Sequence, residues 1–277
     1  KRAKEMLAQK RPRIMALQEM RLGHKTKGSG AMAIAQAKAR GWILEMGRPM
    51  VMMKIARKTG QKWKRNETRT LKQGGVAIMA RKEIGLIRMG RLSGPARMLY
   101  ESRRWARAAI PYNLSRRRDG LLHVASLYCP AGSGAEARSR REWLLELSIQ
   151  DGNEKKGQPF LICADGNVDP DKSQAIREAI ESGEWFDLGR TFAGQEGPSP
   201  TFNADENWDR CDWEGATRPD FVLGNREAKV AVQEVETVKG LGTKGHLPIR
   251  VLLKLGNTKR QEKQIEVPRP YDWENVW

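Results

Sequence analysis

The chain has 277 residues, a formal charge of +18 and a pI near 10.1. This length is sufficient for one large α/β domain, and apolar runs that recur throughout the sequence exclude a globally disordered chain. The excess of Lys and Arg favours a polyanionic partner. Nucleic acid is the first candidate, and an anionic membrane surface or a merely solvated basic face are the alternatives.

Cysteine and histidine usage narrows the class of protein further. Three cysteines at wide spacing and only three histidines argue against a structural zinc site. No apolar stretch approaches the ~18 residues of a membrane span, and no signal-peptide core follows the lysine-rich start. We therefore expect an intracellular protein, and a function on DNA would place it in the nucleus.

The first half of the chain predicts mainly strands. In chain order, we expect a short basic helix over residues 1 to 10, a strand from Ile14 that ends at Glu19, two or three irregular strands between residues 23 and 72, a buried strand over Val76–Ala80, and a meander of weaker strands to about Asn113.

The second half alternates strands with single helices. It predicts a strand over Leu121–Leu127, an amphipathic helix over residues 135 to 150, a strand over Phe160–Ala164 and a helix over residues 171 to 183. This alternation favours two sheets packed face to face with helices outside. Residues 1–256 are expected to form one domain, and residues 257–277 a polar tail or linker.

Several polar residues stand where short apolar runs begin or end. They are Glu19, Tyr128, Asp165, Asn167, Asp220 and His246. If the runs are neighbouring strands of one core, these groups emerge at the same edge and share one site. A carboxylate-rich site with a single histidine indicates metal-assisted phosphate chemistry.

Each member of this set also has a simpler interpretation. Glu19 closes a buried strand and suits Mg²⁺, but a surface glutamate at a strand end is the alternative. Asp165 and Asn167 can supply a base and an amide donor, or they form an ordinary Asx turn. His246 either pairs with a carboxylate or has a structural role, and a lone histidine before a strand is more often structural.

Taken in order, the motifs resemble the endonuclease/exonuclease/phosphatase superfamily, which includes apurinic/apyrimidinic endonucleases and the endonuclease domains of non-LTR retrotransposons. The resemblance spans residues 14 to 252. Its motifs are Leu17-Gln18-Glu19, Gly74-Gly75-Val76-Ala77-Ile78, Leu127-Tyr128-Cys129-Pro130, Ala164-Asp165-Gly166-Asn167, Pro200-Thr201-Phe202, Arg218-Pro219-Asp220-Phe221 and Gly245-His246-Leu247-Pro248.

The resemblance implies a four-layer αββα sandwich and hydrolysis of a phosphodiester with Mg²⁺ (or Mn²⁺). By carry-over, Glu19, Asp165 and Asn167 bind the metal, and Asp165 activates the water. Asp220 orients His246, which stabilises the phosphorus centre or shares the proton. The resemblance also implies that the substrate is bound by Tyr128, Asn167, Thr201 and Arg218.

Three departures from the family pattern bear on activity. Gly245 replaces the acid before the final histidine, Gly166 replaces an aromatic residue and is expected to loosen its loop, and the Asn-bearing first strand would lie upstream of Lys1. The sequence thus predicts a DNA-nicking endonuclease, with a reverse transcriptase expected downstream. The alternatives are a catalytically degenerate nucleic-acid-binding remnant and a phosphatase or phosphodiesterase on a small or lipid substrate.

Overall fold

A six-stranded mixed sheet lies at the centre of the computed structural model, which describes residues 12–18, 29–47, 52–53, 70–71, 75–90, 92–112, 120–203, 215–238 and 245–254. The strand order is β10-β11-β9-β8-β7-β6. Its strands are β6 (Ile87–Arg88), β7 (Trp105–Pro111), β8 (Leu121–Tyr128), β9 (Phe160–Asp165), β10 (Trp185–Asp187) and β11 (Asp220–Asn225). All neighbours pair antiparallel except β8 and β9, which are parallel.

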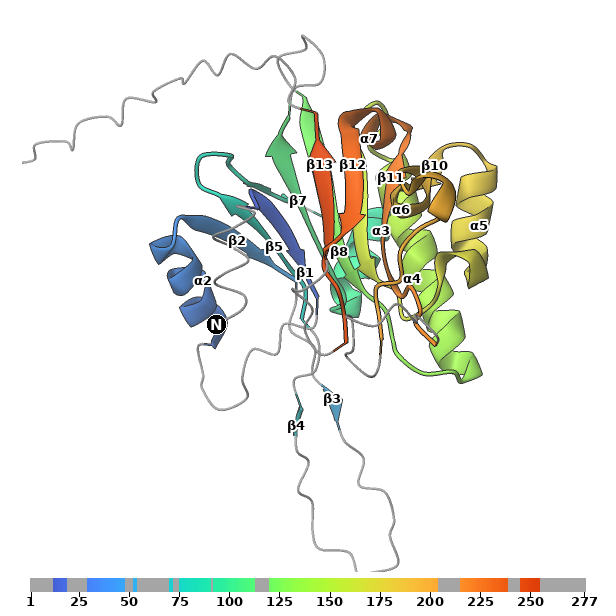
Figure 1. The fold of residues 1–277 in the computed structure, drawn as a ribbon. Helices are drawn as coiled ribbons and strands as arrows, with labels where there is room; N and C mark the ends of the chain where they lie inside the picture. Colours follow the sequence, from blue (N-terminus) through green and yellow to red (C-terminus); the bar gives the residue numbers. More distant parts are fainter. Residues whose placement is uncertain are drawn as a thin grey trace, which may run out of the picture.

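Helices cover one face of this sheet (Figure 1). They are α3 (Gly94–Ser102), α4 (Ala135–Asn153) and α5 (Gln174–Glu181). Their apolar sides meet the sheet in a cluster that includes Leu99, Leu144, Ile176 and Trp185. The helix predicted over residues 135 to 150 is confirmed as α4, because its buried leucines recur at helical spacing.

The opposite face packs against two smaller sheets. One has the order β1-β5-β2 and the other pairs β12 with β13. The strands are β1 (Ile14–Leu17), β2 (Trp42–Met46), β5 (Ala77–Arg81), β12 (Val232–Thr237) and β13 (Ile249–Leu253). Side chains of both smaller sheets join one apolar cluster with the central strands.

The helix α2 (Ser29–Ala39) covers the outer side of β1-β5-β2. In β1, Ile14 and Ala16 face the central sheet, whereas Met15 and Leu17 face the cluster that includes α2. This alternation is the period of a strand buried on both sides. The layers are therefore helix, sheet, sheet and helix, which confirms the predicted αββα sandwich.

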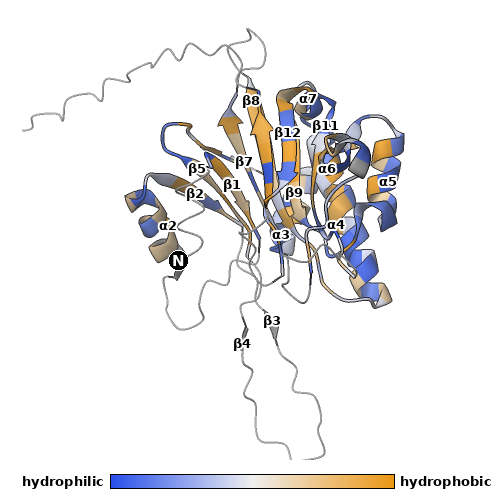
Figure 2. Cartoon of the chain, in the orientation of Figure 1, coloured by the Kyte–Doolittle hydropathy of each residue, from blue (hydrophilic) through white to orange (hydrophobic). Residues whose placement is uncertain are grey.

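Shorter elements complete the described chain. They are the strands β3 (Met52–Met53) and β4 (Thr70–Leu71), the helices α6 (Leu188–Thr191) and α7 (Arg226–Ala231), and the 3-10 turns Pro170–Lys172 and Gly194–Glu196. Figure 2 shows apolar residues concentrated on the strands. In the portion of the chain placed by the structure, every helix is too short or too polar to cross a bilayer.

Two sequence predictions were incomplete, because the expected strands are present but each region also contains a helix. The region expected to hold only irregular strands contains α2, and the expected meander before Asn113 contains α3. Alanine stands at alternate positions from residue 31 to residue 39, which imitates the period of a strand, but alanine has the highest helix propensity. In α3, Pro95 occupies the first turn, where its missing N–H costs nothing. The predicted helix of residues 1 to 10 and the tail after 256 lie outside the described residues.

Candidate active site

The ends of three adjacent strands bring predicted site residues together. Tyr128 ends β8, Asp165 ends β9 and Asp220 begins β11. In the register of the sheet, Asp165 lies opposite Tyr128 on one side and opposite Asp220 on the other. Because β8 and β9 are parallel while β11 is antiparallel to β9, two strand ends and one strand start meet at the same edge.

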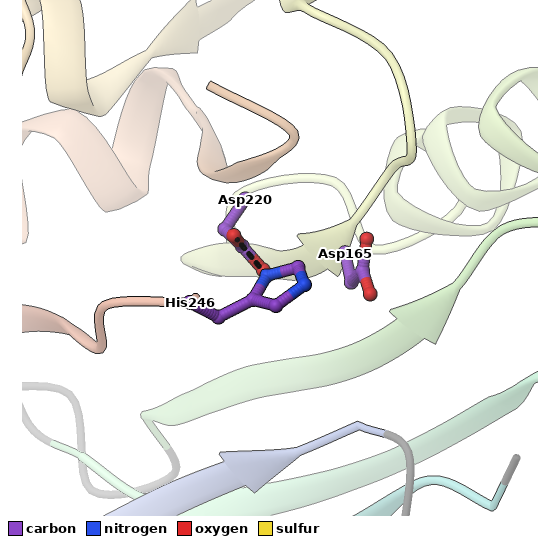
Figure 3. Close-up of side chains that lie close together, drawn as sticks. All are labelled: Asp165, Asp220 and His246. Carbon is purple, nitrogen blue, oxygen red and sulfur yellow. Dashed lines mark hydrogen bonds and ion pairs between the residues drawn. The ribbon is translucent and has the colours of Figure 1, made fainter. Parts of the chain in front are cut away.

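His246 completes a cluster with the two aspartates. One potential ligand atom from each of Asp165, Asp220 and His246 lies within 4.8 Å of the others. The Nδ1 of His246 is 2.8 Å from Oδ2 of Asp220, and the second ring nitrogen faces Asp165 (Figure 3). Asp165 is 5% exposed, whereas the His246 side chain is 33% exposed. The cluster is thus buried at Asp165, and half-buried at Asp220 and at the imidazole.

The backbone of the Pro-Thr-Phe motif holds His246 in place. Phe202 forms isolated β-bridges with both Thr217 and His246, and the N–H of Leu247 donates to the carbonyl of Thr201 at 2.7 Å. The Phe202 ring lies over the imidazole, with the ring centroids 4.7 Å apart. Residues 201–203 therefore join the segment before β11 to the segment before β13.

Thr201, which was expected to contact substrate, lies against the backbone of Asp220. Its side chain is buried, with 1% of the residue exposed. Its hydroxyl accepts a hydrogen bond from the N–H of Asp220 at 3.1 Å and donates to the Asp220 carbonyl at 3.4 Å. Thr201 therefore holds the backbone of Asp220 in place.

Arg218, also expected to contact substrate, is buried in an ion pair with Asp187. It is 6% exposed, and its two terminal nitrogens donate to Oδ1 and Oδ2 of Asp187 at 3.0 and 2.5 Å. Asp187 ends β10 and also accepts from the N–H of Arg190, where it caps α6. This bidentate ion pair anchors the residues just before Asp220. Asp187 was missed by the sequence analysis, because no local pattern marks it as a partner of Arg218.

Asn167 forms the Asx turn that was the simpler interpretation of this segment. Its φ is +49°, its N–H donates to Oδ1 of Asp165 at 3.2 Å, and its Nδ2 donates to the Cys129 carbonyl at 3.0 Å. The segment is therefore an Asx turn, and the turn itself carries Asn167 to the strand-end edge. A left-handed backbone at a non-glycine residue costs free energy and is found often at functional sites.

Gly166 does not loosen this loop, in contrast to the expectation. A Cβ atom built on Gly166 would lie 2.4 Å from Cε1 of Phe221. The N–H of Gly166 also donates to the Pro219 carbonyl at 2.7 Å. The ring of Phe221 thus occupies the space beside the glycine and packs the loop tightly.

Gly245, just before His246, has a backbone that excludes other residues. Its φ is +81°, and a Cβ atom there would lie 2.6 Å from the carbonyl oxygen of Asn203. Both observations make glycine the residue that fits this turn. The accessory carboxylate of the family is absent, and this backbone has no room for it.

Glu19 lies outside the described residues, but its neighbour Gln18 is placed. The Nε2 of Gln18 donates to Oγ of Ser126 and to the Cys163 carbonyl, both at 3.0 Å. The Ser126 hydroxyl in turn donates to the Leu17 carbonyl at 2.9 Å. The end of β1 is therefore tied to β8 and β9, one residue before Glu19.

Arg104 adds a positive charge beside Tyr128. Its Nη1 donates to the Tyr128 carbonyl at 3.2 Å, and its guanidinium carbon lies 5.2 Å from the centre of the phenol ring. Burial lowers the pKa of Arg104, the charge of Arg140 lowers it further, and Tyr128 and Asp165 raise it. An anion at this edge would therefore meet at least one nearby guanidinium. In the sequence, two adjacent arginines at 103 and 104 are the local signal that could have indicated it.

The donors at this edge suit a hard divalent cation. The carboxylate of Asp165 is buried, that of Asp220 is close by, and the amide of Asn167 lies in the adjoining turn. Two carboxylates at such short range repel each other, and a cation between them removes the repulsion. Carboxylate and amide oxygens are the ligands that Mg²⁺ takes in proteins, and an imidazole extends the range to Mn²⁺.

Comparisons with known proteins agree with this architecture. The chain is similar in structure to an AP endonuclease from Archaeoglobus fulgidus (TM-score 0.58, 17% identity, covering 90% of this chain and 91% of that one). It is also similar to the APE2 catalytic domain of Xenopus laevis (TM-score 0.61, 16% identity, 91% and 86% covered). A third match is the 3′ phosphatase NExo from Neisseria bound to a product DNA hairpin (TM-score 0.54, 17% identity, 91% and 93% covered).

At these identities the structural matches show the fold alone. A search of curated protein sequences gives no match. The sequence model of the endonuclease/exonuclease/phosphatase family matches residues 1–241, which is most of the chain. With the αββα layers and the cluster at the strand ends, this match shows that the chain belongs to the endonuclease/exonuclease/phosphatase family.

Proposed function

We propose that this protein nicks DNA by hydrolysing a phosphodiester with the help of a divalent cation, as the endonuclease domain of a retroelement does ahead of its reverse transcriptase. Members of the family are hydrolases that act on phosphodiester bonds. The observation that carries the proposal is the convergence of Asp165, Asp220 and His246 within 4.8 Å at an edge shared with Tyr128 and Asn167.

The hydrogen bond between Asp220 and His246 determines which proton transfers the site supports. Asp220 accepts from Nδ1, so Nε2 stays directed toward Asp165. A water between Asp165 and Nε2 has a proton acceptor on each side. Either Asp165 deprotonates it while a protonated His246 faces the phosphate, or His246 takes the proton and Asp165 orients the water.

Asp165 and Asn167, together with Glu19, would hold the cation. When bound, it neutralises charge on the phosphate oxygens as a Lewis acid. Asn167 and Tyr128 supply hydrogen-bond donors to the same phosphate, and Arg104 adds a positive charge behind Tyr128. Thr201 and Arg218 act through Asp220, whose position they fix.

DNA is favoured over a small substrate by charge. When a chain with a formal charge of +18 binds a polyanion, counterions are released, and this release favours binding. A small substrate such as an inositol phosphate does not require so large a charge. One NExo structure among the similar proteins carries a DNA hairpin, which adds support for a nucleic-acid substrate. A retroelement origin rests on the resemblance of the motifs.

Conversion of supercoiled plasmid to open circles tests the proposal. We expect Mg²⁺- or Mn²⁺-dependent nicking that chelation abolishes, and a loss of about 10²–10⁴-fold in His246→Ala, the usual contribution of a general acid or base. His123→Gln is the matched control, because His123 is buried beside Phe160, 5.8 Å between ring centroids, on the helix-covered face of the sheet. Equal loss in both variants would contradict the proposal.

Gly245 favours a second candidate function, which is nucleic-acid binding without cleavage. The missing acid removes one possible ligand of the cation, and the backbone at Gly245 leaves no room to restore it. Fluorescence anisotropy with labelled duplex separates the two candidates. Salt-dependent binding that is equal in the parent chain and in Asp165→Asn, with no product under any cation, would favour this second function.

A further inference from the structure

The segment that connects β8 to α4 supports several groups of the candidate active site. It comprises residues 129–134 and begins directly after Tyr128. Its first residue, Cys129, joins it to β9, because the N–H of Cys129 donates to the Asp165 carbonyl at 2.8 Å and the carbonyl of Cys129 accepts from Nδ2 of Asn167 at 3.0 Å. The positions of Tyr128 and Asn167 therefore depend on where this connecting segment lies.

Arg141 of α4 ties the connecting segment to the helix. Its Nη1 donates to the carbonyl of Pro130 at 3.1 Å and to the carbonyl of Gly132 at 2.6 Å. The backbone turns at Gly132, whose φ of +114° favours glycine. Arg141 itself is 6% exposed. One buried guanidinium thus holds two carbonyls of the segment, the first of them directly after Cys129.

The burial of Arg141 is costly for the fold. Its neighbours on the buried side of α4 include Leu144 and Leu145, which are both 0% exposed. In the part of the chain that the structure describes, its side-chain hydrogen bonds go to the two carbonyls, which carry no formal charge. A buried charge with neutral partners is only partly compensated. Residues that break a rule of stability in this way are expected at functional sites.

Glu142, the next residue of α4, holds the chain that follows β9. Its Oε2 accepts from Oγ of Ser173 and from the N–H of Ala175, both at 2.9 Å. Ser173 is fully buried and caps α5. The segment between Asn167 and α5 is therefore fixed at its far end. Two adjacent residues of α4 thus hold the chain after β8 and the chain after β9.

We propose that Arg141 is a positioning residue of the candidate active site. From α4 it holds the connecting segment, so that Tyr128 and Asn167 stay directed at the same phosphate. It acts through the backbone of Pro130 and Gly132. The proposal rests on the proposed function, because the positions of Tyr128 and Asn167 affect a rate only if the site cleaves a phosphodiester.

Plasmid nicking separates positioning from the loss of a charge. Arg141→Met removes both hydrogen bonds, keeps most of the length of the side chain and should lower kcat about 10–100-fold. Arg138→Met is the matched control, because it removes an exposed arginine three residues earlier on the same helix, and its kcat should equal that of the parent chain. The affinity for labelled duplex, measured by fluorescence anisotropy, should fall equally in both variants. Arg141→Lys should recover part of kcat, because an ammonium can still donate to one carbonyl.

Hydrogen exchange followed by mass spectrometry tests the tether without catalysis. A peptide that covers residues 128–134 reports on the amide of Cys129, which donates to the Asp165 carbonyl. We expect it to exchange about tenfold faster in Arg141→Met than in the parent chain or in Arg138→Met, while residues 121–127 exchange equally in all three. A parent chain that does not nick DNA would contradict the proposed function, and the exchange rates would still decide whether Arg141 holds the segment.

Two results would overturn the proposal. One is a loss of kcat in Arg141→Met that is no greater than in Arg138→Met. The other is equal exchange of residues 128–134 in the parent chain and in Arg141→Met, because the segment would then keep its place without the guanidinium. If Arg141→Met does not fold, Arg141→Lys decides, and values of kcat and exchange equal to those of the parent chain would overturn the proposal.

Discussion

Breaking the buried ion pair between Arg218 and Asp187 should unfold the protein more easily without removing a substrate contact. The two side chains are 8% and 2% exposed. Removal of one partner leaves the other charge buried and unpaired, which costs about 3–5 kcal/mol of unfolding free energy. Asp187→Ala also removes the cap of α6, so it should cost about 1 kcal/mol more than Arg218→Met.

The double variant separates a positioning role from a substrate contact. With both charges replaced by apolar side chains, we expect a cost well below the sum of the two single variants. Urea unfolding at pH 7 gives each free energy. Arg97→Ala, which removes an exposed pair with Glu101, is the control and should cost less than about 1 kcal/mol.

Additive costs in the double variant, or single costs below about 1 kcal/mol, would refute this reasoning. So would a double variant that is folded and stable yet has lost its affinity for DNA, since that result would assign Arg218 a direct contact with the phosphate.

Three further outcomes follow from the structure. Thr201→Val should lower kcat and leave the affinity for DNA unchanged, because it removes two bonds that position Asp220; an unchanged kcat would contradict this. Gly245→Ala should cost about 2 kcal/mol or more by urea unfolding, against about 1 kcal/mol for Gly183→Ala, which shares the positive φ but has open space. Burial lowers the pKa of His123, so the folded state resists protonation and the free energy of unfolding should fall as pH drops below about 6.5, by at most 1.4 kcal/mol per pH unit. In His123→Gln this part of the slope should vanish.

The central strands could be predicted from the sequence because both of their faces are covered. β9 then reads as a continuous apolar run and β8 as a mostly apolar one, and the polar residues that end them mark the edge of the sheet. α2 could not be recognised in this way, since its alternating alanines carry the period of a strand. The tertiary contact of Ala37 with Trp42 and Leu44 decides in favour of the helix.

Only those site residues that a local sequence pattern marks could be predicted. Asp165, Asp220 and His246 each stand at the boundary of an apolar run, and the structure brings them together. The roles of Thr201 and Arg218 depend on partners 19 and 31 residues away along the chain. No spacing rule in the sequence encodes such pairs. From the sequence alone, a residue that positions a catalytic group therefore cannot be distinguished from a residue that contacts substrate.

The cysteine at the active-site edge is shielded from oxidants by burial. Cys129 is 0% exposed, and burial raises the pKa of its thiol far above the usual range. Its carbonyl meanwhile accepts from Asn167. Since the thiolate is the reactive form, neither peroxide nor an alkylating reagent should reach this sulfur while the fold is intact. Oxidants should therefore leave the hydrogen bond between Asn167 and the Cys129 carbonyl undisturbed at this position.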